Sequence, residues 1–198
     1  MATYASIKYD MDLASSATGT GALPLLSTQT ASSSSTISFT SGIDSTYKEY
    51  IFKFYDIHPA TDQTFLSFQA DTGTNTSYNQ TITSTFFAAY HGEDGTGAAL
   101  AYAESYDQAQ ATSFQYITDR TGTDNDQTVA GTLHLFDPSS STFVKHFIAQ
   151  SNCNEQSNYS SQAFAAGYFN TTTALTRVQF KMNSGNIDAG VIKMYGVS

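Results

Sequence analysis

Residues 48–57, KEYIFKFYDI, give the clearest indication of the fold class of this chain. Aromatic residues occupy every second position in this stretch, at Tyr50, Phe52 and Phe54. A period of two is the pattern of a β-strand that buries one face and exposes the other. The sequence therefore predicts a strand at 48–57 whose aromatic side enters a hydrophobic core.

Similar short runs, separated by turn residues, recur along the rest of the chain. We predict strands at 36–40, 64–70, 81–90, 111–118, 127–137, 142–150, 161–170, 174–182 and 189–197. The segment 97–111 forms either a helix or a loop with a strand. About ten strands at this spacing are typical of two antiparallel sheets packed face to face. We therefore expect one all-β domain over 36–198, an antiparallel and jelly-roll-like β-sandwich.

Residues 1–35 differ in composition, since they are rich in Ser, Thr, Ala and Gly. Such a segment buries little apolar surface. We interpret it as an extended N-terminal arm or lead-in strand, with 23–30 able to form the strand. The arm either docks on a neighbouring subunit or hangs as a tail.

Charge and composition exclude several classes of partner. The 198 residues carry a net charge of -9, and only 13% of them are charged, which is about half the usual share. The eight basic residues are scattered, so no patch exists for a nucleic-acid backbone. No apolar run approaches the 18 or so residues of a membrane span, and we expect that the N-terminal segment is not a secretory signal, since it has no basic or apolar region of that kind. The single cysteine, Cys153, is expected to be an inert thiol.

Two histidines raise the question of a metal site. His134 and His146 stand within neighbouring predicted strands. If these strands pair as a hairpin, the two imidazoles approach on one face and supply half of a metal site. No carboxylate or cysteine at a fixed spacing completes it, so we predict ordinary sheet residues.

Two loops carry clustered oxygen ligands. The loop 91–97 contains His91, Glu93 and Asp94, and the loop 121–127 contains Asp124, Asn125 and Asp126. The first cluster could hold a hard cation or act as an acid/base pair, and the second could bind calcium, although it lacks the spacing of the EF-hand calcium loop. We predict solvated loops and leave open whether either binds an ion.

Nothing in the sequence supplies a catalytic motif. The nucleophile elbow, the phosphate loop and the zinc helix motif are all missing. We therefore predict no enzyme, no catalytic residue, no cofactor and no metal, although a carboxylate pair of the glycosidase type is invisible to sequence spacing. Several tyrosines near polar loops could contact sugar rings or simply line the core: Tyr90, Tyr102, Tyr106, Tyr116, Tyr159 and Tyr168.

Two stretches resemble a family of proteins. Residues 27–63, which include SGIDSTYKEYIFKF and IHPATD, and residues 184–197, which close on GVIKMYGV, resemble virion-associated proteins of tailed phages from aquatic bacteria. The two stretches cover about a quarter of the chain. The resemblance implies a jelly-roll-like sandwich and a structural place in a phage particle, and it supplies no catalytic residue.

The composition and the resemblance lead to one functional expectation. We expect a non-enzymatic virion component, made in the host cytoplasm, in the tail or fibre apparatus. Its expected partners are copies of itself, other virion proteins and a host-surface glycan, without nucleic acid or membrane insertion. The alternatives are a capsid decoration or head-spike protein of the same fold and, from another class, a small glycan-active enzyme.

Overall fold

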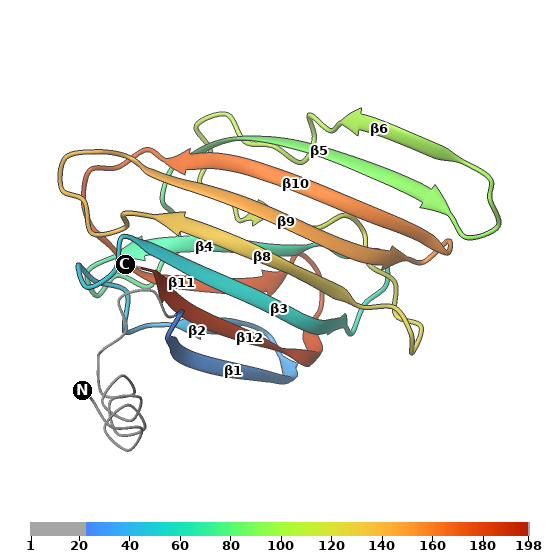
Figure 1. Cartoon of the computed structure of the whole chain (residues 1–198), viewed down its shortest axis with the longest axis horizontal. Helices are drawn as coiled ribbons and strands as arrows, with labels where there is room; N and C mark the ends of the chain where they lie inside the picture. The colour runs from blue at the N-terminus through green and yellow to red at the C-terminus, as the bar shows by residue number, and fades with distance from the viewer. Residues whose placement is uncertain (1–22, 198) are drawn as a thin grey trace, which may run out of the picture.

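The chain folds into two antiparallel β-sheets in a computed structural model that describes residues 23–197 (Figure 1). The large sheet has eight strands. In spatial order they are β1 (Leu25–Ser34), β12 (Ile187–Val197), β3 (Glu49–Pro59), β8 (Val129–Phe136), β9 (Lys145–Glu155), β10 (Tyr159–Phe169), β5 (Ile82–Gly92) and β6 (Ala98–Tyr102). The small sheet has four strands, in the order β2 (Ile37–Phe39), β11 (Leu175–Met182), β4 (Leu66–Thr72) and β7 (Gln115–Tyr116). The predicted all-β antiparallel sandwich is thus confirmed.

Phenylalanine rings fill the space between the sheets. The ring of Phe68 in β4 is fully buried, and its centroid lies 5.0 Å from that of Phe147 and 5.8 Å from that of Phe169. The alternating aromatic residues at 50, 52 and 54 are also buried, as predicted. Burying rings of this size is the main force that holds two sheets together.

The described residues contain no helix, so the helical alternative for 97–111 is wrong. Residues 98–102 form β6 and pair with β5, and residues 108 and 111 also bond to the backbone of β5. A helix here would leave these β5 groups without partners. A membrane-crossing helix is likewise absent from this part of the chain.

The N-terminal segment is described only in part. Of the predicted arm at 1–35, residues 1–22 lie outside the described residues, and residues 25–34 form β1 at one edge of the large sheet. The predicted strand at 23–30 corresponds to β1. It pairs along its length with β12, so the two ends of the described chain lie side by side.

Two glycines allow close approach of neighbouring strands in the large sheet. A Cβ atom at Gly131 would lie 2.5 Å from the carbonyl oxygen of Gln150, and one at Gly167 would lie 2.4 Å from that of Thr83. Real Cβ contacts are longer than this, so only glycine fits at either place without a backbone shift.

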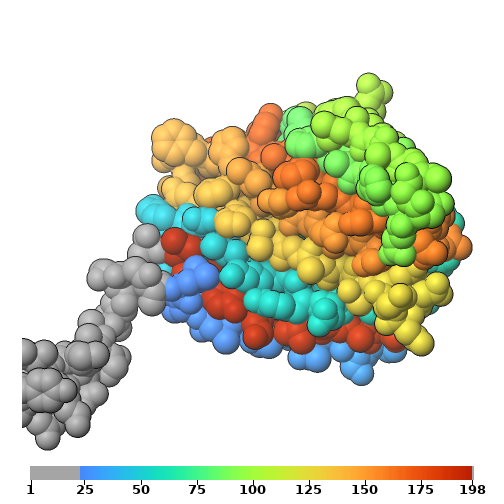
Figure 2. Space-filling view, turned by 45° about the vertical axis from the view of Figure 1, so that its right-hand side comes forward, coloured from blue at the N-terminus to red at the C-terminus, as the bar shows by residue number. Residues whose placement is uncertain are grey.

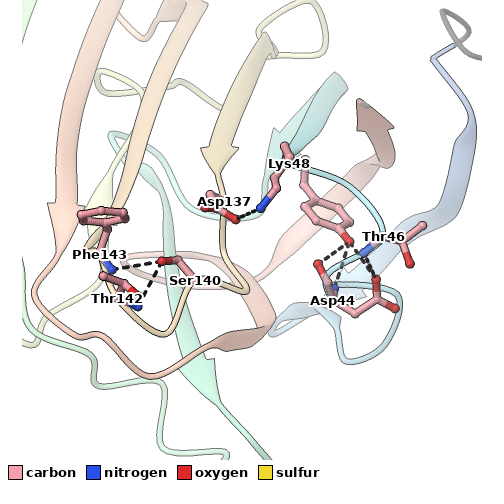
Figure 3. Close-up of polar contacts among 8 residues, drawn as sticks. Asp44, Thr46, Lys48, Asp137, Ser140, Thr142 and Phe143 are labelled. Carbon is pink, nitrogen blue, oxygen red and sulfur yellow. Dashed lines mark hydrogen bonds and ion pairs between the residues drawn. The ribbon is translucent and has the colours of Figure 1, made fainter.

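The sandwich has two different ends (Figure 1). At the terminal end, β1 begins, β12 ends, and the loop 137–144 joins β8 to β9. There, Asp44 accepts hydrogen bonds from the Thr46 amide and the Tyr50 hydroxyl, and Lys48 pairs with Asp137 (Figure 3). At the opposite, loop end lie the β5–β6 and β9–β10 turns and the loop before β8. Figure 2 shows the outer face of the large sheet, with β1 at one edge and β5–β6 at the other.

Candidate functional site

A polar hollow lies at the loop end, on the inner side of the large sheet. Along β5, β9 and β10 every second residue faces inward, and these residues are mostly buried and apolar up to Ala88, Cys153 and Ala163. The next inward positions toward the loop end are Tyr90, Glu155 and, past Ser161, Tyr159. The inner face therefore changes from apolar to polar where the strands leave the core.

The segment that follows β7 closes this hollow from the other side. Ile117 bonds to the backbone of β4, and the Ser151 hydroxyl donates to the Ile117 carbonyl at 2.7 Å. These bonds hold Asp119 and Arg120 against the inward-facing ends of β9 and β10. The resulting hollow has a volume of about 310 Å³, and it is lined by Tyr90, Asp119, Arg120, Glu155, Ser157 and Tyr159. That volume is at the lower end of the range for small-molecule sites.

Two carboxyl groups form the floor of the hollow. Asp119 is 7% exposed, and it accepts hydrogen bonds from the Ser161 hydroxyl at 2.8 Å and from the Arg120 amide at 2.8 Å. The carboxyl of Glu155 lines the same hollow. Burial raises the pKa of Glu155 to about 7, the charge of Asp119 adds to this, and the Arg120 guanidinium opposes it. Near neutral pH the pair therefore offers both a proton donor and acceptors.

Two tyrosine rings form a wall of the hollow. The rings of Tyr90 and Tyr159 are nearly perpendicular, at 80°, with centroids 5.6 Å apart. Tyr159 packs against the backbone of the β5–β6 turn: a Cβ at Gly97 would lie 3.1 Å from its hydroxyl oxygen, and one at Gly92 would lie 3.2 Å from its ring. The two glycines therefore make room for this ring and hold it in place.

Among residues 23–197, the arginine supplies the only basic side chain that lines this hollow. Arg120 is exposed, and it takes part in none of the ion pairs found among residues 23–197. A second, smaller hollow of about 70 Å³ continues past it to Gln63 and Gln156, whose side-chain amides bond to each other. The arginine donors are thus available to a ligand in the hollow.

The two predicted strand histidines do not form a metal site. Their strands pair as the predicted hairpin, and both residues face outward, but His134 lies opposite Ile148 and not His146. His134 Nδ1 lies 2.5 Å from a Glu49 oxygen, whereas the His146 ring packs near Tyr168. Within residues 23–197, no three His, Cys, Asp or Glu side chains are grouped as metal ligands.

The two predicted loops border the loop end, and Asp94 and Asp124 make hydrogen bonds within local turns. Asp94 accepts from the amide and the hydroxyl of Thr96, and these bonds lower the pKa of Asp94. In the other loop, the Asp124 amide donates to the Gln127 side chain, and the Asp124 carbonyl accepts from the Gln127 amide. Such bonds are typical of turn residues.

The six tyrosines singled out above separate into different environments. Tyr106 and Tyr116 pack with Phe65, where ring centroids lie 4.8 and 4.6 Å apart, so they belong to the edge of the core. Tyr102 donates to Asp107, and Tyr168 lies on the outer face of the sheet. Only Tyr90 and Tyr159 of this group reach the polar hollow.

Sequence reasoning missed Asp119, Arg120 and Glu155. One signal was available for Glu155, since it continues the inward period of β9 beyond Cys153 and is nevertheless ionisable. No comparable signal marks Asp119 and Arg120, because they lie in a segment without regular alternation. Their place beside the ends of β9 and β10 depends on the order of the strands in the sheets.

A larger hollow of about 480 Å³ lies on the outer face of the large sheet, over Gly167. Apolar groups such as Ile148 and Ala166 dominate its lining, and it contains no carboxylate or basic side chain other than His146. It therefore lacks the convergent polar groups that orient a small ligand.

Comparison with protein-family models, with curated protein sequences and with solved structures gives no match for this chain. Its function has therefore to be inferred from its own residues.

Proposed function

We propose that the chain is a non-enzymatic structural component of a tailed-phage virion, in the tail or fibre apparatus, with its loop end turned toward the host surface. The observation that carries this proposal is where the two phage-like stretches lie. Residues 27–63 and 184–197 contribute β1, β2, β3 and β12, and β1, β12 and β3 are direct neighbours in the large sheet. Two stretches far apart in sequence thus form one continuous block.

The difference between the two ends of the sandwich supports the same role. The phage-like block carries both ends of the described chain, and the polar hollow lies at the opposite end of the strands. In this proposal the sandwich is jelly-roll-like, and the N-terminal segment 1–35 attaches it to the particle. The loops at the far end are then free to contact a host-surface glycan.

Exposed apolar residues support contacts with copies of itself and with other virion proteins. Phe87, Leu100, Tyr102 and Ile148 are 39–71% exposed on the β5–β6 side of the large sheet, and Phe143 is 70% exposed at the terminal end. Within the described residues, β6 pairs with β5 alone and leaves an open sheet edge. Apolar surface and open edges of this kind are typical of assembling proteins.

The carboxyl pair also favours a second candidate, a small glycan-active enzyme. In most glycosidases two carboxyl groups stand about 5 Å or more apart with the sugar between them. Turnover of a polysaccharide by the purified protein, lost in Glu155→Gln, would support the enzyme.

The experiment that tests the proposed role is localisation in purified particles of a phage that encodes this sequence. An antibody raised against residues 23–197 would be gold-labelled and examined by electron microscopy. Label on the tail or fibres is expected. Label on the head would favour a decoration or spike protein, and particles that contain no such chain by mass spectrometry would overturn the virion role.

A further inference from the structure

The polar hollow has a composition that suits a particular class of sugar. Ring faces come from Tyr90 and Tyr159, donors from Arg120 and Ser157, and acceptors from the carboxyl pair below them. A sugar ring has one apolar face and hydroxyls that each donate and accept. A wall of aromatic rings beside mixed donors and acceptors matches both properties.

The site is held in shape before any ligand arrives. Asp119 is nine-tenths buried and is fixed by two hydrogen bonds of 2.8 Å, one of them from the buried Ser161 hydroxyl. Tyr159 is held against the β5–β6 turn, which is itself bonded to the β9–β10 turn, because the Glu93 amide donates to the Asn158 carbonyl at 2.9 Å. Groups that are already ordered lose little conformational entropy on binding.

The surrounding charge selects against acidic sugars. Two carboxyl groups line the hollow, although Glu155 is only partly ionised near neutral pH, and Arg120 is the single basic side chain among the described residues that line it. The Asp94 carboxylate lies beside the Tyr159 ring, since both are within 3.2 Å of the position that a Cβ on Gly92 would occupy. A uronate or sialate in the hollow would face these like charges at close range.

We propose that this hollow binds one or two rings of an uncharged sugar, with a ring stacked on the tyrosine wall and hydroxyls bonded to Arg120 and to the Asp119–Glu155 pair. This inference rests on the proposed function, because it names the class of glycan that the exposed loop end contacts. It concerns the isolated protein, so it can be tested without the particle.

The test uses the purified full chain on an array of neutral, sialylated and uronate oligosaccharides, followed by titration calorimetry with the best ligand. We expect a neutral glycan to bind. Its affinity should fall about tenfold or more in Tyr159→Ala, which removes a stacking ring. A similar fall is expected in Arg120→Ala, which removes an exposed side chain, and circular dichroism of this variant checks that it folds. Tyr102→Ala removes an exposed tyrosine outside the hollow and should bind like the natural protein.

Three outcomes overturn the inference: no neutral glycan bound at millimolar concentration, stronger binding of an acidic glycan, or undiminished affinity in Arg120→Ala. The glycan-binding test and the localisation test can also fail separately. A chain found in the tail that binds no neutral sugar refutes only the sugar site. A chain that binds the sugar but is missing from particles refutes only the virion role.

Discussion

Replacing Glu155 by Gln should change how the stability of the sandwich depends on pH. In the unfolded chain the carboxyl has an ordinary pKa of 4.5, whereas in the folded protein burial raises the pKa of Glu155 to about 7. Below pH 4.5 both states hold the proton, so the ionisation of Glu155 adds no pH dependence to the free energy of unfolding. Between pH 4.5 and 7 unfolding releases the proton, so stability falls as the pH rises, and above pH 7 the loss is complete.

The size of the effect follows from the same two values. Moving a carboxyl pKa from 4.5 to about 7 corresponds to about 3 kcal/mol if the group were fully shielded from water. Glu155 is only partly buried and lines an open hollow, so solvent screens much of this energy. We therefore expect the natural protein to lose about 1 kcal/mol between pH 5 and pH 8 that Glu155→Gln does not lose.

The assay is urea unfolding at pH 5, 6, 7 and 8, followed by tyrosine fluorescence or circular dichroism. Glu93→Gln serves as the matched control, since it removes an exposed carboxyl from the adjacent turn and should keep the pH dependence of the natural protein. Parallel curves for the natural protein and Glu155→Gln would show that this carboxyl ionises normally, and the raised pKa inferred for Glu155 in the hollow would be wrong.

Three further predictions concern the core and the sheet. Phe68→Ala should lower the free energy of unfolding by about 3–5 kcal/mol in urea titration, because its fully buried ring sits among other phenylalanines. Gly131→Ala should cost about 2 kcal/mol or more, since the new Cβ would meet the Gln150 carbonyl at 2.5 Å, whereas Gly73→Ala, with open space and a φ of 56°, should cost about 1 kcal/mol; equal losses would contradict this. Cys153 should resist a thiol reagent at pH 8 until the protein unfolds, because burial raises its pKa to about 12; rapid labelling of the native protein would refute this.

Much of the fold could be predicted from local patterns. The alternation at 48–57 anticipated both the strand and its buried aromatic face, because a period of two has one structural solution. The segment 97–111 was ambiguous, since alanine and tyrosine suit a helix or an edge strand. The backbone groups of β5 need hydrogen-bond partners, and this need favours strand β6 over a helix. Because β5 lies outside residues 97–111, the sequence of that segment does not show it.

The residues of the candidate site were also predicted only in part. Sequence patterns identified Tyr90 and Tyr159 as tyrosines near polar loops and marked the 91–97 and 121–127 loops at what proved to be one end of the sandwich. These patterns could not predict that Asp119 and Glu155 line the same hollow. The two residues share it because residues 117–121 run beneath β9 and β10, where Ile117 bonds to Ser151 and Asp119 bonds to Ser161.

Local sequence patterns were enough to identify a weakly charged set of β-strands, because side-chain alternation and turn residues act over a few positions. The grouping of polar residues in one hollow depended on the three-dimensional arrangement, because strand order and register set the distances between side chains that are far apart in the chain.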